Sequence, residues 1–201
     1  MNIIVIVLIV VVVIISLWFA WGLISPHIWE QPEYEILEKL DKVEIRRYKQ
    51  SKILTARAFT SGNAFSKLSS YIFGKNKEKQ KIPMTSPVLT EITDNNEVRM
   101  VFYLPKKYEN KDIPTPLMQD VKTENQNERN VAVIRFYGRM TYKRREKNID
   151  NLLEILEKND IETQGSLFFL NYSDPFVPPP LRRNEIGIEV GIKSLIRDLI
   201  S

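Results

Sequence analysis

The amino-terminal residues form one uninterrupted apolar run. Ile3 to Ile24 contains neither charge nor proline, and about 22 helical residues span a hydrocarbon core of about 30 Å. Three tryptophans cluster around its carboxyl end, where an aromatic belt belongs: Trp18 and Trp21 within the run, and Trp29 after it. The run is too long for a cleaved signal peptide and has no basic region before it. We therefore expect an uncleaved transmembrane anchor over residues 1–26, with residues 3–24 in the bilayer, and a linker over 27–33.

Charge near this run says little about orientation. The first basic residue is Lys39, and the acidic residues that precede it contribute little to a rule that counts positive charge. The pattern predicts a single-pass membrane protein. It leaves the side of the domain open, and slightly favours an amino terminus inside and a domain outside the cytoplasm.

After the linker, short segments alternate apolar and polar residues with the period of two that is typical of strands. In the first half these segments are Val43–Tyr48, Lys52–Phe59, Val88–Ile92 and Val98–Leu104. Between the second and the third, Phe65, Leu68 and Ile72 recur at helical spacing. Asn63 is a candidate cap at the start of this helix, and Gly74 is suited to its end.

The second half repeats this order. After a stretch without clear period from Lys106 to Arg129, read as a crossover, the chain contains a strand, a helix and two more strands: Val131–Tyr137, the helix with Ile149, Leu152, Leu153 and Leu156, then Leu167–Tyr172 and Ile186–Ile192. An offset of about 80 to 88 residues relates the halves, which indicates a duplicated unit.

The predicted fold class is therefore α+β. Two duplicated half-barrel units form a distorted antiparallel β-barrel flanked by two helices, preceded by one transmembrane helix. The domain covers residues 34–192. Residues 193–201 follow as a tail or a short closing helix.

A proline-rich segment, Asn171 to Val190, leads into the last strand. Its prolines fix φ and hold the preceding residues extended, which predicts a stiff connector of polyproline type. Arg182, Arg183 and Glu185 follow it at the mouth of the sheet. The segment is either a solvated strand connection or the rim of a binding site.

Composition excludes several classes of function. The net charge of +4 is spread among interleaved acidic residues, with no basic stripe that would follow a phosphate backbone, so we expect no nucleic-acid partner. Cysteine is absent, and the one histidine, His27, precedes the domain. Zinc sites and Ser–His–Asp or Cys–His catalysis are therefore excluded within the domain. We expect a protein that is not an enzyme, without a catalytic residue or a structural metal.

The motifs of this chain, taken in order, resemble the SOUL haem-binding protein family over Tyr34 to Val190. The residues that carry the resemblance are Tyr34-Glu35, Val43-Glu44-Ile45-Arg46-Arg47-Tyr48, Gly62-Asn63-Ala64-Phe65, Tyr71-Ile72-Phe73-Gly74, Lys81-Ile82-Pro83-Met84-Thr85-Ser86-Pro87-Val88, Tyr172-Ser173-Asp174-Pro175-Phe176 and Arg182-Arg183-Asn184-Glu185. The resemblance implies two similar halves in a distorted antiparallel barrel, and a hydrophobic groove beside the first helix of the domain. That groove would take haem or another tetrapyrrole, with basic residues at its edge for the propionates.

Carried onto this chain, the resemblance implies a groove wall and a propionate rim: Phe65, Leu68, Ile72 and Met84 for the wall, Arg182 and Arg183 for the rim. An apolar wall with guanidinium groups at its edge suits a flat apolar dicarboxylic ring. Other interpretations stay open. The three helix residues are spaced as in any core-facing helix, methionine commonly fills gaps in cores, and the arginines could pair internally with Glu185 or Asp174.

The chain departs from the family in one respect. Some members are thought to hold haem iron through histidine, and no histidine lies within this domain. Met84, Met100 and Tyr71 remain as weak axial candidates. We therefore expect haem to be bound non-covalently and loosely, with little dependence on iron.

A second hypothesis is a non-haem small-molecule-sensing or protein-interaction module of the same fold. The duplicated half-barrel also resembles the ligand domains of some multidrug-responsive regulators, whose ligands are amphipathic cations. A site for propionates should be edged by Arg and Lys, and a site for cations by Glu and aromatic faces. The sequence does not indicate the physiological ligand, a transport, storage or signalling role, or the oligomeric state.

Overall fold

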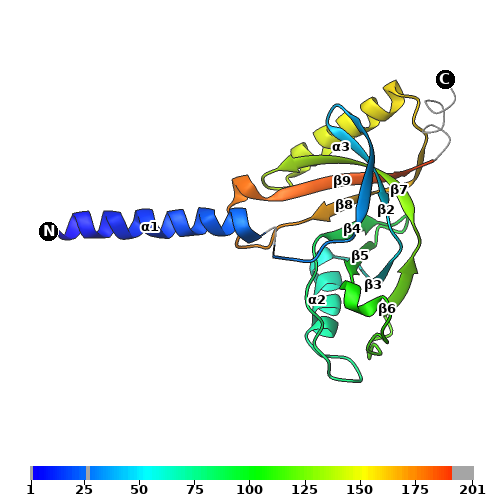
Figure 1. Cartoon of the computed structure of the whole chain (residues 1–201), viewed down its shortest axis with the longest axis horizontal. Coiled ribbons are helices and arrows are strands. Elements are labelled where there is room, and N and C mark those ends of the chain that lie inside the picture. The colour runs from blue at the N-terminus through cyan, green and yellow to red at the C-terminus, as the bar shows by residue number, and fades with distance from the viewer. Residues whose placement is uncertain (1, 26–27, 192–201) are drawn as a thin grey trace.

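The computed structural model describes residues 2–25 and 28–191, and Figure 1 shows one long helix that projects from an α+β domain. This helix, α1 (Ile3–Ile24), ends where the sequence predicts. Among the described residues it is the one helix long and apolar enough to cross a membrane, and its apolar window is not buried against the domain. By length and composition alone, a signal sequence would pass the same test.

The domain is built on one nine-stranded sheet in which every ladder between neighbouring strands is antiparallel. Across the sheet the strands follow the order β1-β2-β7-β9-β8-β4-β5-β3-β6. Their bounds are β1 (Tyr34–Leu40), β2 (Val43–Tyr48), β3 (Ser51–Ala58), β4 (Val88–Ile92), β5 (Val98–Tyr103), β6 (Val121–Gln126), β7 (Arg129–Tyr137), β8 (Thr163–Asn171) and β9 (Arg183–Val190). The α+β class with an antiparallel sheet and an apolar amino-terminal helix is thus confirmed.

Two helices pack on the sheet: α2 (Ser61–Ile72) and α3 (Tyr142–Lys158). The cap of α2 is Thr60, whose side chain accepts a hydrogen bond from the Asn63 backbone N–H, so the prediction of Asn63 as the cap was wrong by one turn. Threonine serves here because its β-region backbone leaves the hydroxyl facing the first turn. Gly74 follows the helix with a φ of +103°, as expected for a residue that ends it.

Two similar units make up the sheet. The series β3-α2-β4-β5 matches β7-α3-β8-β9, and the units meet where β4 pairs with β8. Within this repeat the strand Val131–Tyr137 (β7) corresponds to β3 and not to Val43–Tyr48 (β2), because β7 directly precedes its helix as β3 does. β2 and β7 are instead neighbours in the sheet. Each unit also carries a strand from the other, since β2 pairs with β7 and β6 pairs with β3.

Both edge strands were missed by the pattern. β1 falls at the start of the expected domain, and β6 lies in the stretch Lys106–Arg129 that was read as a crossover. In β6 only Val121 is buried, so the strand has no apolar alternation to reveal it. Its backbone pairs with β3 regardless of its polar side chains. The same stretch also contains the short 3₁₀ helix η2 (Lys106–Tyr108).

Three apolar clusters form the core. One lies between α2 and its half of the sheet and includes Leu68 and Phe102. A second lies between α3 and the other half and includes Leu152 and Ile186. The third includes Val101 and Phe168 and draws residues from both halves, so the face away from the helices curls around a common interior.

The proline-rich connector differs in detail from its prediction. It contains a short 3₁₀ helix, η3 (Pro179–Leu181), and β9 begins at Arg183, before the apolar alternation starts. Figure 1 shows that this connector lies against the carboxyl end of α1. The predicted closing helix over 193–201, and the end of the last predicted strand at Ile192, lie outside the described residues.

Candidate functional site

A groove runs along the seam between the two halves. Helix α2 packs over β3, β5 and β6, whereas α3 packs over β7 and β9, so the central strands β4 and β8 have no helix above them. The outward side chains of Val88 and Thr90 on β4, and of Phe169 and Asn171 on β8, therefore form the floor of a cavity of about 1000 Å³. This is the upper end of the range of about 300–1,000 Å³ that is typical of small-molecule pockets.

Apolar side chains form the wall of this seam cavity on the side of α2. Phe65 and Ile72 come from the helix, Met84 from the loop before β4, and Met100 from β5. The Phe65 ring meets the Phe102 ring edge-on at 5.5 Å between centroids, which holds it upright although it is 43% exposed. The wall is therefore apolar and open to solvent, as an unfilled ligand surface would be.

Charged residues on the lining are mostly basic. Lys81, Lys107 and Arg145 line the cavity with a single acid, Asp174. Asp174 accepts hydrogen bonds from the Ser25 hydroxyl and the Phe176 backbone N–H, which occupy its carboxylate. The seam cavity is therefore suited to an anion with a large apolar body.

Arg145 enters the cavity from the first turns of α3. Its guanidinium lies 5.4 Å from the centroids of both the Tyr142 and Phe169 rings, so aromatic faces hold it at the floor. Its Nε is buried without a hydrogen bond and forms an ion pair with the Glu146 carboxylate at 3.4 Å. The charge that Arg145 presents at the cavity floor is therefore partly compensated by Glu146.

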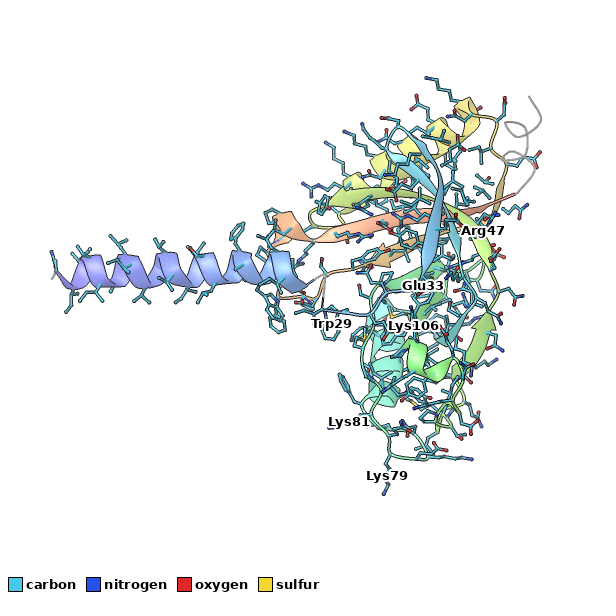
Figure 2. The ribbon with its side chains drawn as sticks, viewed as in Figure 1. Trp29, Glu33, Arg47, Lys79, Lys81 and Lys106 are labelled. Carbon is cyan, nitrogen blue, oxygen red and sulfur yellow. The ribbon has the colours of Figure 1, made fainter. Side chains whose placement is uncertain are left out.

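The remaining lining closes the cavity toward α1. Trp29 comes from the segment after α1, and Ser173 and Pro175 from the connector before η3. Figure 2 places Trp29 at the junction of α1 with the domain, and Lys81 on the side from which α1 projects. The rest of the lining is Ser61, Gly62, Phe73, Ile82, Pro83, Thr85, Ser86, Ile92, Val98, Met140 and Tyr172.

Comparison with known families assigns this domain. The family model described as SOUL heme-binding protein matches residues 29–189, which is most of the chain. The chain belongs to the SOUL haem-binding protein family. The match begins at Trp29, at the edge of the seam cavity, and ends within β9.

Two curated relatives match this SOUL protein over most of its length. Heme-binding protein 2 of Mus musculus is 28% identical over 166 residues, covering 73% of this chain and 80% of the relative. Heme-binding protein 2 of Homo sapiens is 28% identical over 173 residues, covering 80% and 83%. Both are named as binding proteins.

Solved structures share the fold at low identity. The EcmrR C-terminal domain superposes with a TM-score of 0.56 at 12% identity, over 79% of this chain and 98% of that one. A conserved protein from Listeria innocua gives 0.55 at 10% identity, over 75% and 92%. These likenesses show that the duplicated architecture recurs in other proteins.

The structure distributes the expected groove residues of the SOUL domain between surface and core. Phe65, Ile72 and Met84 come together on the cavity wall. Leu68 is fully buried beneath them in the first core cluster, because it lies on the helix face that packs on the sheet. Tyr71 is also fully buried, and its hydroxyl donates a hydrogen bond to the Pro114 carbonyl, which removes it from the groove as an iron ligand.

Arg182 and Arg183 lie outside the cavity lining. Arg182 donates from Nε to the Val177 carbonyl at 2.9 Å and from Nη2 to the Pro175 carbonyl at 2.7 Å. Arg183 donates from Nε and Nη2 to Glu185 and lies 3.7 Å above the Tyr172 ring. These donors are engaged within the protein, and the cations on the cavity lining are instead Lys81, Lys107 and Arg145.

Glu185 is the most constrained charge in the described residues. Its side chain is fully buried and accepts from Arg46, Arg135, Arg183 and Tyr172. Burial alone would raise its pKa, but the hydrogen bonds and charges of Arg46 and Arg183 outweigh it and lower the pKa to about 2. A carboxylate held ionised by several cations is a poor general base, so this cluster is structural.

Sequence reasoning missed the cavity cations. Lys81 precedes the proline-framed loop whose Met84 was singled out, and its place before that motif was a usable signal. No sequence signal identified Arg145, because its position at the cavity depends on how α3 crosses the sheet. Among the described residues no group of His, Asp and Glu side chains could hold a metal ion, and the thioethers of Met84, Met100 and Met140 are the soft donors on the lining.

Proposed function

We propose that this SOUL protein is a membrane-anchored haem or tetrapyrrole binder that holds the porphyrin in the seam cavity without histidine ligation. The observation that carries the proposal is the combination of a cavity of about 1000 Å³ with three basic side chains and one acid on its lining. A tetrapyrrole is a flat apolar ring with two carboxylates, and this lining offers a surface for each part.

The residues present fit the ring and its carboxylates. Phe65, Ile72 and Met84 would hold one side of the apolar ring, and Phe169 the floor. Lys81, Lys107 and Arg145 would hold the propionates, in place of the arginines implied by the family resemblance: Arg182 and Arg183. Bound haem would contribute its apolar ring and its negative charge, and the chain's side chains would exclude water and fix its orientation.

Iron contributes little in this proposal. His27 is the one histidine of the chain and lies outside the described residues, and the donors on the lining are methionine thioethers. Thioethers alone are weak anchors for ferric iron. Binding should therefore depend on burial and charge, and the retained haem should be exchangeable.

The bilayer is the second partner in the proposal. Helix α1 has the length for a span and exposes its apolar side chains along its whole length. We favour an uncleaved single-pass anchor over a signal peptide, with the domain on the extracytoplasmic side. The anchor would keep the porphyrin close to the membrane in which it partitions.

The role is binding rather than catalysis. The relatives matched along most of the chain are named as binding proteins, and the most constrained carboxylate, Glu185, is neutralised by arginines. The alternative of a sensor for amphipathic cations requires acidic groups at the cavity. Asp174 is the one acid on the lining, and it is already hydrogen-bonded.

A charge-reversal titration tests the proposal. The full chain in nanodiscs is titrated with haemin, followed by the Soret band, and compared with Lys81→Glu/Arg145→Glu. The matched control is Lys79→Glu/Arg47→Glu, which changes the net charge equally at an exposed and a half-buried site, both away from the cavity lining (Figure 2).

We expect the cavity variant to weaken haemin binding by at least about tenfold, a loss of about 1.4 kcal/mol, and the control to leave it unchanged. Equal haemin affinity of the two variants would show that Lys81 and Arg145 do not bind the propionates. A wild-type chain that does not perturb the Soret band would overturn the function itself.

A further inference from the structure

The last two turns of α1 pack against the 174–181 loop, the segment Asp174–Leu181. The Trp18 indole Nε1 donates a hydrogen bond to the Phe176 carbonyl at 2.6 Å, and the Ser25 hydroxyl donates to Asp174. Gly22 lies so close to the loop that a Cβ there would be 2.8 Å from Pro178 and from Leu181. The helix and the loop are therefore fitted to one another.

This contact places the loop alongside the apolar helix and not beyond its end. Trp18 precedes the last residue of α1 by six positions, which is about 9 Å along a helix axis. Phe176 is thus level with a point about 9 Å inside the apolar run. In a bilayer spanned by α1, whose 22 residues about match the hydrocarbon core, that level lies among the outer acyl chains, several ångströms below the headgroup boundary.

The exposed chemistry of the loop suits that level. The Phe176 side chain is 75% exposed, beside Trp18, which is 46% exposed. Both are residues of the interfacial type. Four of the eight positions are proline, which has no N–H to leave unpaired: Pro175, Pro178, Pro179 and Pro180.

Several backbone groups of the loop are hydrogen-bonded within the protein. Three successive carbonyls accept hydrogen bonds: those of Pro175 and Val177 from Arg182, and that of Phe176 from Trp18. The N–H groups of Phe176 and Val177 bond to Asp174. A segment that enters a low-dielectric layer needs this, because unpaired backbone groups there are costly. Arg182, which is outside the cavity lining, therefore serves to pair two carbonyls of this loop.

The loop adjoins the seam cavity. Asp174 and Pro175 line the cavity together with Trp29, which follows α1 in the chain. In Figure 1 the other wall, α2, lies on the side of the domain from which α1 projects. The cavity therefore opens beside the loop on the side that faces the membrane.

We propose that the 174–181 loop is a second membrane-contacting element, which inserts Phe176 among the outer phospholipid acyl chains and sets the mouth of the seam cavity against the bilayer. It rests on the proposed anchoring by α1 and goes beyond it. An apolar ligand would then pass between lipid and cavity without crossing water. The continuity of the loop with α1 identifies lipid, and not another protein, as the occupant of this face.

The chain contains no cysteine, so single labels report cleanly. Phe176→Cys in the full chain is labelled with an environment-sensitive fluorophore and reconstituted in phosphatidylcholine nanodiscs. One chain per disc ensures that a second copy of the chain cannot bury the label. The matched control is Leu117→Cys, an apolar side chain that is 61% exposed, lies in the loop before β6 and is outside the cavity lining.

We expect the label at 176 to show blue-shifted emission and quenching by lipids spin-labelled near the headgroup, and the label at 117 to report water. In a second variant, Gly22→Leu should separate loop from helix and return the label at 176 toward water. Water-like emission at 176, equal quenching at both sites, or no effect of Gly22→Leu would each overturn the inference.

Haemin binding in the same discs separates the two proposals. A buried label at 176 without haemin binding removes the porphyrin function alone. Haemin binding with a label in water removes the membrane contact alone.

Discussion

The Arg46 guanidinium and the Glu185 carboxylate meet at 2.7 Å inside the curled sheet, with side-chain exposures of 1% and 0%. β2 and β9 are not neighbours, since β7 lies between them. The pair therefore links β2 to β9 across the intervening strand β7, on the sheet face that points away from the helices. Removing one member of such a pair leaves an uncompensated buried charge.

Glu185→Ala should lower the free energy of unfolding by about 3–5 kcal/mol, because Arg46 then stays buried without its partner. Urea unfolding of the domain, followed by near-UV circular dichroism, measures the change. Glu128→Ala is the control: Glu128 pairs with Arg47 at 3.6 Å on the surface, and such pairs contribute about 0–1 kcal/mol. Similar losses in both variants would contradict a structural role for the buried pair.

Acid should destabilise the domain through the same carboxylate. The folded pKa of Glu185 is about 2 against 4.5 for the free group, so its contribution is complete above about pH 4.5 and is lost as the pH falls toward 2. That difference corresponds to about 3 kcal/mol. Unfolding free energies measured from pH 7 to pH 2 should fall steeply in this window.

Two variants isolate this carboxylate. Glu185→Gln should flatten the acid limb. Glu33→Gln should retain it, because Glu33 pairs with Lys106 and Lys49 in an exposed position. A steep acid limb that survives in Glu185→Gln would assign the effect to other groups.

Iron should matter little for porphyrin affinity. Haemin and metal-free protoporphyrin IX should bind the full chain within about tenfold of one another, because the cavity lining offers thioethers and no imidazole. Competition titration measures the ratio. A low-spin six-coordinate spectrum together with much tighter haemin binding would show a strong axial ligand.

Filling the seam cavity should block the ligand without unfolding the domain. Thr90 is on the floor, paired across the seam with Phe169, so Thr90→Trp should lower haemin affinity by more than about tenfold. Thr123→Trp on the exposed edge strand β6 is the matched control. Unchanged haemin affinity in Thr90→Trp would place the porphyrin elsewhere.

Gly187→Ala should be destabilising by about 1–3 kcal/mol. A Cβ at this position of β9 would be 2.6 Å from the Phe168 ring and 3.2 Å from Val131, so the interior has no room for it. Gly62→Ala, in α2 with nothing within 4 Å, should be neutral or stabilising by up to about 1 kcal/mol. Thermal unfolding compares the two, and the reverse order would contradict this packing.

Local pattern sufficed for the elements with one apolar face. The strands that contain Val43, Val88 and Val131 form where their apolar residues predict them, although β7 is buried at five consecutive positions. Of the residues that recur at helical spacing, α2 buries Leu68 and Ile72, and α3 buries Leu152 and Leu156. Edge strands β1 and β6 escaped because backbone pairing holds them with little side-chain burial. The periodicity of apolar residues in a sequence indicates which side chains are buried. It indicates only indirectly which strands pair through their backbones.

The site was harder to predict because it is assembled at the seam. Phe65 and Met84 come from one half, and Arg145 and Phe169 from the other. No local spacing relates them. Phe65 and Ile72, which the family resemblance implied, line the cavity, whereas Leu68, one turn along the helix from Phe65, points into the core. Arg182 and Arg183 are turned away from the cavity because nearby carbonyls and the Glu185 carboxylate accept their hydrogen bonds. The order of residues in the sequence does not predict these contacts.

The exchange of β2 and β6 between the halves has a consequence for the dissection of this domain. A chain cut between β5 and β6 would yield two fragments, each holding a strand whose ladder partner is on the other. Neither fragment could complete its own sheet. The two fragments should therefore reassociate, or each should pair with a second copy of itself. The arrangement is the one that results when two copies of such a unit each contribute a strand to the sheet of the other.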